Sequence, residues 1–130
     1  MKQEDQELLL KDLCARLPYG VKCKVSYNSG VINDADATLY GMDKDGFLMF
    51  DEIGGDHREF LCKPYLFPLS NTTKEQRKEY YAMVKYNITS NDNAKLMDWL
   101  NKNHFDYRGL IAKGLAVDAT GLNIYKEKTK

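Results

Sequence analysis

The chain carries no excess charge, because 19 Lys and Arg residues balance 19 Asp and Glu residues over its 130 positions. A protein without net charge is not drawn as a whole toward nucleic acid or an anionic membrane. Long hydrophobic runs are lacking near the start, where the three leucines at 8–10 are too few for a secretory signal or a membrane span. We therefore expect a cytoplasmic protein that does not enter membranes.

Cysteine is scarce. The three cysteines, Cys14, Cys23 and Cys62, form no CxxC pair and no zinc spacing, and an odd number cannot close into a complete disulfide framework. Free cysteine behaves as a small hydrophobe and is often buried. We expect all three to pack in the core of a protein from a reducing compartment.

Histidine is scarcer still. The two histidines, His57 and His104, lie close to acidic residues but have no second spaced ligand on the same element. A transition-metal site needs three or four convergent donors, so the sequence predicts no metal. A solvated loop position for His57 and a helix C-terminal cap for His104 are favoured over a ligand or a catalytic base.

Catalytic motifs are absent. The chain contains no G-x-S-x-G elbow, no Walker A loop and no dinucleotide fingerprint. The sequence therefore predicts no enzyme, no catalytic residues and no cofactor. An enzyme would need a site assembled from scattered residues such as Asp56, His57 and Glu59, which sequence alone cannot bring together.

The first half of the chain has the pattern of one helix followed by strands. Leucines at helical spacing predict an amphipathic helix over residues 3–17, stopped by Pro18. Alternating and β-rich runs predict four short strands at residues 21–27, 35–42, 47–53 and 58–62. Turn residues at 28–30 and an Asp-Gly pair within 43–46 separate the first three strands, and the second of these turns predicts a hairpin.

The second half, beyond a junction at residues 63–70, is helical in pattern. Thr72 and Glu75 have the spacing of a capping box, which predicts a helix with Tyr80 and Tyr81 on its apolar side. A further helix, capped by Ser90 or Asn91, is apolar on nearly all sides, with Leu96, Met97, Trp99 and Leu100. Such a helix is either well covered or contacts a partner. Residues 104–125 leave a short helix and short strands open as alternatives.

These elements predict an α+β protein: an N-terminal helix, a four- to five-stranded curled antiparallel sheet or a small SH3-like or Sm-like barrel, and C-terminal helices. We expect a single domain over residues 1–130, as is usual for this length. Its expected parts are a helix at 1–18, the antiparallel sheet at 19–70, a mainly helical part at 71–125 and a polar tail at 126–130.

Charge is distributed unevenly between the halves. Residues 1–62 hold 7 basic against 12 acidic residues, and residues 63–130 hold 12 against 7. The halves could attract each other, or the basic half could associate with nucleic acid. The basic surface for such a contact would be made by eight of the 12 basic residues: Lys74, Arg77, Lys78, Lys85, Lys95, Lys102, Arg108 and Lys113. They are mixed with acids along the helices, so a solvated face is the stronger interpretation and nucleic acid the alternative partner.

One short segment concentrates the residue types that are favoured at interfaces. His104, Phe105, Asp106, Tyr107 and Arg108 place two aromatics, an acid, an arginine and a histidine side by side. An internal role is open as well, with Asp106 and Arg108 paired or capping a helix and the aromatics in the core. We take these five residues as the candidate contact site for a protein partner.

Three stretches carry a resemblance to a known group of proteins: LPYGVKCKV at 17–25, KPYLFPLS at 63–70 and NHFDYRGLIAKGLA at 103–116. They resemble a family of small uncharacterised bacterial proteins encoded in prophages and other mobile elements of gut bacteria. The resemblance implies a cytoplasmic bacterial setting and an accessory role in phage replication or host takeover, without assigning any functional residue. The predicted function is thus non-catalytic binding of a protein partner.

Overall fold

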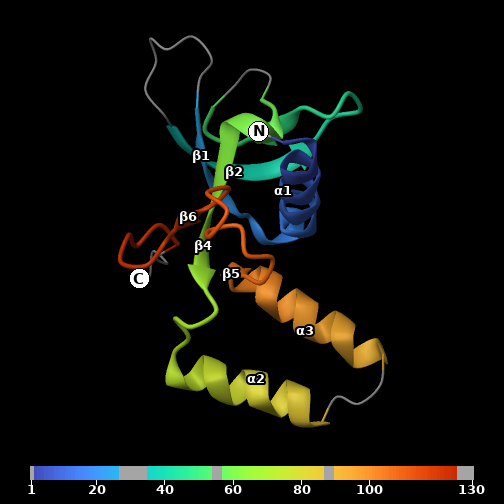
Figure 1. Cartoon of the computed structure of the whole chain (residues 1–130), viewed down its shortest axis with the longest axis vertical. Helices are drawn as coiled ribbons and strands as arrows, with labels where there is room; N and C mark the ends of the chain where they lie inside the picture. The colour runs from blue at the N-terminus through green and yellow to red at the C-terminus, as the bar shows by residue number, and fades with distance from the viewer. Residues whose placement is uncertain (1, 27–34, 54–56, 87–89, 126–130) are drawn as a thin grey trace.

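Three α-helices and an open six-stranded sheet make up the part of the chain that the structure describes (Figure 1). The structure is a computed structural model, and it describes residues 2–26, 35–53, 57–86 and 90–125. The α+β class expected from the sequence is confirmed. The predicted turn at 28–30, the loop residue Asp56 and the tail at 126–130 lie outside the described residues.

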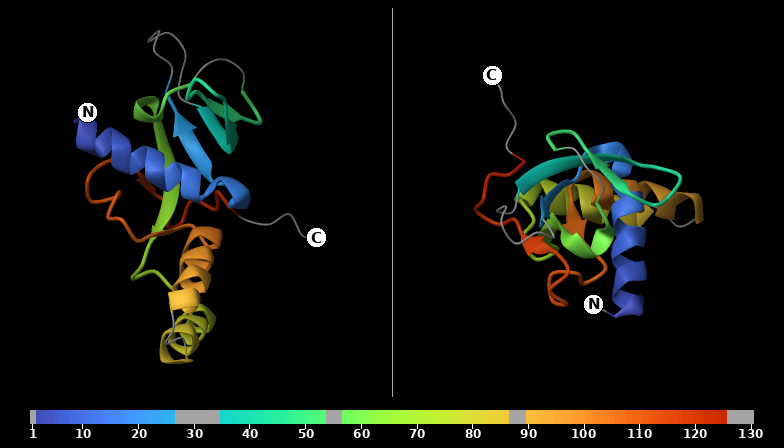
Figure 2. Two further views of the ribbon diagram at one scale, coloured as in Figure 1. Left: turned by 90° about the vertical axis from the view of Figure 1, so that its right-hand side faces the viewer. Right: turned by 90° about the horizontal axis from the view of Figure 1, so that it is seen from above.

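Helix α1 (Gln3–Ala15) lies across one face of the strands (Figure 2). Leu9 and Leu13, one turn apart, are fully buried there, and burial of a leucine contributes about 1.5–3 kcal/mol each. The helix was expected over 3–17. It ends two residues earlier because Leu17–Tyr19 form a short 3-10 turn (η1) around Pro18, closed by Gly20 in the left-handed conformation.

Four strands form an antiparallel array in the order β3-β2-β1-β4: β1 (Lys22–Val25), β2 (Ala35–Met42), β3 (Leu48–Phe50) and β4 (Cys62–Pro68). Strand β2 has the predicted bounds, while β1 and β3 are shorter than predicted. The predicted hairpin between β2 and β3 is confirmed. Its turn is held by Asp43, whose carboxylate accepts hydrogen bonds of 2.9 Å from the backbone N–H groups of Asp45 and Phe47.

The fourth strand was predicted wrongly at 58–62. Residues Glu59–Leu61 form a 3-10 turn (η2), and the strand is β4, which runs through two prolines. The Leu61 carbonyl accepts a hydrogen bond from Ser26 N–H, so the backbone groups of Leu61 face β1. Backbone groups alternate between the two edges of a strand, so those of Pro64, three residues later, face away from β1. Proline has no N–H, and its absence therefore removes no hydrogen bond to β1. The junction that divided the sequence is therefore a strand of the sheet.

The sheet does not close, so the SH3-like or Sm-like barrel is wrong, and the sheet is not purely antiparallel. Strands β5 (Phe105–Asp106) and β6 (Val117–Asp118) pair with β4 in parallel. Strand β3, at the far end of the order, pairs with β2 and forms one bridge with His57, and it does not pair with β4 in the described part of the chain. The sheet thus extends beyond the residues 19–70 that were expected to contain it.

Helices α2 (Lys74–Tyr86) and α3 (Ser90–Lys102) form a hairpin at the end of the molecule away from β1 and β2 (Figure 1). Helix α2 packs against α3, and α3 reaches the sheet through β5. The capping box at the start of α2 lies one residue later than predicted. The Thr73 hydroxyl accepts from Gln76 N–H at 3.1 Å, and the Gln76 side chain accepts from Thr73 N–H at 2.9 Å.

Candidate functional site

The predicted contact segment begins in the interior. Phe105 is 1% exposed, and its carbonyl accepts a 2.6 Å hydrogen bond from the buried Arg16 guanidinium. Arg16 also donates to both carboxylate oxygens of Asp12, at 2.8 and 3.1 Å. Segment 104–108 is therefore attached to α1 by charge-assisted bonds, which are stronger than neutral ones.

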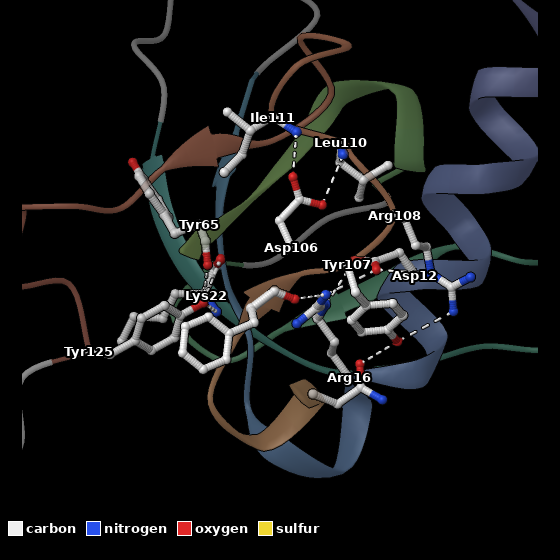
Figure 3. A network of polar contacts seen from close by, with 12 residues as sticks. Asp12, Arg16, Lys22, Tyr65, Asp106, Tyr107, Arg108, Leu110, Ile111 and Tyr125 are labelled. Carbon is white, nitrogen blue, oxygen red and sulfur yellow. Dashed lines mark hydrogen bonds and ion pairs between the residues drawn. The ribbon is translucent and has the colours of Figure 1, made fainter. Parts of the chain in front are cut away.

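The next three residues also make internal contacts. Asp106 accepts 2.9 Å hydrogen bonds from the backbone N–H groups of Leu110 and Ile111, which fixes the turn after β5 (Figure 3). The Tyr107 hydroxyl donates to Asn101 at 2.7 Å.

Arg108 reaches back to Asp12, with 3.1 Å between Nε and Oδ1. The Tyr107 ring lies between two guanidinium groups, 5.1 Å from that of Arg16 and 5.0 Å from that of Arg108. These arrangements match the internal alternative in part: Phe105 lies in the core and Asp106 fixes a turn, whereas Arg108 pairs with Asp12 and Tyr107 is half-buried. Contact of its five residues with a partner stays a prediction, and only the half-buried Asp106, Tyr107 and Arg108 offer surface for it.

His104 caps α3 through its backbone. Its N–H donates to the Asn101 carbonyl, and its φ of 60° is the left-handed conformation that ends helices. The imidazole stacks on the Tyr125 ring, with centroids 3.8 Å apart and planes 11° apart. Burial, together with the charge of Arg16, lowers the pKa of His104 to about 4. The predicted cap is found, but the neutral ring carries no charge to interact with the helix dipole.

His57 is not the solvated loop residue that the sequence predicted. It is 5% exposed, and its ring meets Phe50 edge-on at 5.5 Å. Its backbone bridges to β3, which explains the burial, since Leu48 N–H donates to the His57 carbonyl at 2.7 Å. Across the described ranges, no group of three or more His, Cys, Asp or Glu side chains could hold a metal ion.

An apolar groove of about 310 Å³ runs between α2 and α3. Its walls are three aromatic rings and three leucines: Tyr80, Tyr81, Trp99, Leu69, Leu96 and Leu100. Tyr81 is 65% exposed, Leu69 47% and Tyr80 38%. From Lys74 to Ala82 every side chain of α2 is exposed except Gln76, which is half-buried. Thus α2 has an aromatic face that the described part of the chain leaves largely uncovered.

The aromatic wall is connected to the sheet. Tyr80 lies 6.2 Å from Trp99 between ring centroids, and Trp99 lies 5.4 Å from the buried Phe105. Aromatic pairs at such separations attract each other beyond the area they bury. The groove is therefore held in a defined position relative to the core through Trp99 and Phe105.

A larger and more polar cleft of about 640 Å³ lies beside the start of α2 and includes His104 and Tyr125. Several of its polar groups already have partners within the chain. Thr73 and Gln76 bond each other, and the Asn103 amide donates to the Trp99 carbonyl at 2.9 Å. This cleft therefore has fewer polar groups available to a ligand, and the groove between α2 and α3 is the better candidate site.

The sequence contained one signal for the groove, namely that residues 96–100 are apolar around nearly the whole helix. It did not reveal which elements would form the opposite wall, because that depends on how α2 folds back on α3.

No model of a known protein family, no curated protein and no solved structure matches the chain. The resemblance to mobile-element proteins therefore remains a prediction. Within the described residues, no helix has the length and apolar character required to span a bilayer.

Proposed function

We propose that this protein is a non-catalytic protein-binding accessory factor and that a partner docks in the groove between α2 and α3. The observation that carries the proposal is the exposed aromatic face of α2 beside Trp99. Tyr81 leaves 65% of its surface to solvent although it lines an apolar groove. Exposed apolar surface with aromatic side chains is typical of protein-binding sites.

The residue types support this site on energetic grounds. Tyrosine, tryptophan and arginine are the side chains most enriched among interface hot spots, and the groove contains Tyr80, Tyr81, Trp99 and Arg77. Each aromatic ring offers a large contact area and loses few rotatable bonds on binding. The setting we propose, an accessory role in the cytoplasm of a bacterium that carries a phage or mobile element, rests on the resemblance alone.

The test begins with crosslinking of the protein to its partner in a host-cell lysate, followed by purification of the identified partner. Its affinity is then measured for the wild type, for Tyr81→Ala and for Tyr40→Ala. Tyr40 is a matched control, because it is 53% exposed on β2, outside the hairpin. We expect Tyr81→Ala to weaken binding about tenfold, as for a moderate hot spot, and Tyr40→Ala to leave it unchanged.

Equal binding of the wild type and Tyr81→Ala would exclude the groove. Nucleic acid is the alternative partner, and three exposed basic residues in the first turns of α2 (Lys74, Arg77 and Lys78) favour testing it. Capture that disappears after nuclease treatment, with affinity falling steeply as salt rises, would replace the proposal by this alternative.

A further inference from the structure

We infer that the groove between α2 and α3 receives an acidic amphipathic helix of the partner protein, bound by its apolar side chains and by a carboxylate. The inference rests on the proposed docking function and adds the chemistry of the partner. It follows from three features of the groove: an unpartnered donor, the position of its charge and its shape.

The first feature is the indole N–H of Trp99, which is buried and has no hydrogen-bond partner among the described residues. An indole nitrogen can only donate, so only an acceptor can satisfy it. A buried donor without a partner is unfavourable, and most buried polar groups in proteins are paired. Because this nitrogen has almost no exposed surface, the Trp99 ring has to shift before an acceptor of the occupant can bond to it, and that bond removes the cost.

The second feature is that the charge at the groove is positive. Arg77 is the charged residue among the described residues that line it, and one of its nitrogens, Nη1, donates to the Thr72 carbonyl at 3.1 Å. A guanidinium has five N–H donors, so others remain for a carboxylate, which it binds in bidentate geometry. An acidic group on the occupant is the complement of this site.

Three acidic residues of the hairpin, Glu75, Glu79 and Asp98, lie away from Arg77. At 100° per residue, Glu75 and Glu79 fall on the side of α2 opposite Arg77, while Lys74 and Lys78 fall next to it. On α3, Asp98 lies near Tyr19, and its charge, after burial, contributes to a raised pKa of that tyrosine. The rim near Arg77 is thus basic, and it would repel a basic peptide.

The third feature is shape. The groove lies between two helices and has room for a few side chains rather than a folded domain. An amphipathic helix places its apolar side chains on such a groove at positions i, i+3, i+4 and i+7, which leaves its flanks free for charged residues. Apolar walls and a basic rim together select a helix with an apolar face and an acidic flank.

The probe is a display library of random 16-residue peptides, selected on the whole chain. Trp99 is the single tryptophan of the sequence, so its fluorescence reports occupation of the groove by peptides that lack tryptophan. We expect selected peptides to combine apolar residues spaced three and four apart with Asp or Glu, and to shift the emission of Trp99. Arg77→Glu should lower the affinity of these peptides about fivefold, as reversal of a partly exposed charge does. Lys44→Glu, the same change in the remote β2–β3 turn, should not.

The other outcomes distinguish the claim that the groove is the docking site from the claim that its occupant is acidic. Neutral or basic peptides that shift Trp99 emission, or acidic ones that bind Arg77→Glu as well as the wild type, would overturn the acidic partner and leave the groove as the docking site. An absence of selected peptides, or peptides that bind without changing Trp99 emission, would overturn the groove itself. A dimer in sedimentation that is lost in Tyr81→Ala would show a second copy of the chain as the occupant and would also overturn the inference.

Discussion

Asp12 in α1 and Arg16, the residue that follows this helix, form an ion pair in which both side chains are completely buried. The same carboxylate also pairs with Arg108, whose side chain is 20% exposed, so one acid serves two guanidinium groups. Through Arg16 it also supports the hydrogen bond to the Phe105 carbonyl. The pair thus connects the N-terminal helix to a segment about 90 residues later in the chain.

Removing the acid should leave two arginines uncompensated. We expect Asp12→Ala to lower the free energy of unfolding by about 4 kcal/mol, because Arg16 would remain charged in a site without solvent. Urea denaturation followed by circular dichroism measures the change. Glu7→Ala, on the exposed side of the same helix, is the control and should cost less than about 1 kcal/mol. Similar costs for the two variants would contradict a structural role of the buried pair.

Stability should depend on pH through His104. The pKa of this residue is about 4 in the folded chain, against an ordinary value of 6.5, because burial disfavours the charged ring. Between pH 6.5 and 4 the unfolded chain therefore binds a proton that the folded chain does not. Stability is complete above pH 6.5 and falls by about 3 kcal/mol as the pH drops through this window.

The control for this effect is His104→Asn, since asparagine tolerates the left-handed backbone at this position. Unfolding curves at a series of pH values should show a smaller decrease for the variant than for the wild type. Carboxylates titrate in the same range, so the difference between the two proteins is the quantity to measure. Parallel pH profiles would show that His104 is not buried in the neutral form.

The first turn of α2 should depend on Thr73 and not on Thr72. Only the Thr73 hydroxyl accepts from the Gln76 N–H in the described structure, and loss of an N-cap costs about 1 kcal/mol. Amide hydrogen exchange in the first turns of α2 should accelerate about fivefold in Thr73→Ala. Thr72→Ala should exchange like the wild type. Faster exchange in Thr72→Ala than in Thr73→Ala would instead place the N-cap at Thr72, as the sequence pattern predicted.

The thiols should differ in reactivity. Burial raises the pKa of Cys62 to about 12, with the charge of Glu59 as a further cause, and raises that of Cys23 well above its ordinary value. Cys14 is only partly buried, and its pKa is raised by burial as well. Iodoacetamide labelling at pH 8, read by mass spectrometry, should modify Cys14 first and the other two only on unfolding. Early labelling of Cys23 would contradict its place in the core.

The sequence pattern predicted an element correctly where residues close together in the chain determine its structure. The strand Ala35–Met42 was predicted with its observed bounds because its alternation and the Asp-Gly turn after it depend on adjacent residues. The cap of α2 was misplaced by one residue because Thr72 and Thr73 each have an acid or amide three residues later, and pattern alone cannot choose between them.

The candidate site was predictable only in part. The all-round apolar helix near Trp99 indicated either cover or a partner, whereas the segment at 104–108 suggested an interface and proved to be largely occupied with internal contacts. A side chain suited to an interface is equally suited to a core, because burial of aromatics and pairing of charges stabilise both. Only the three-dimensional structure, which gives the distances between elements, distinguishes an interface segment from a core segment.

By itself the sequence determined the α+β class, the opening helix, the β2–β3 hairpin and the absence of known catalytic motifs, since each depends on residues close together in the chain. Tertiary structure decided that Phe105 and Val117 pair with β4, that Arg16 is buried and that the groove lies between α2 and α3. The reason is that an open strand edge can pair with any backbone that reaches it. Strands of two residues, such as β5 and β6, are too short to produce a recognisable pattern of side chains in the sequence.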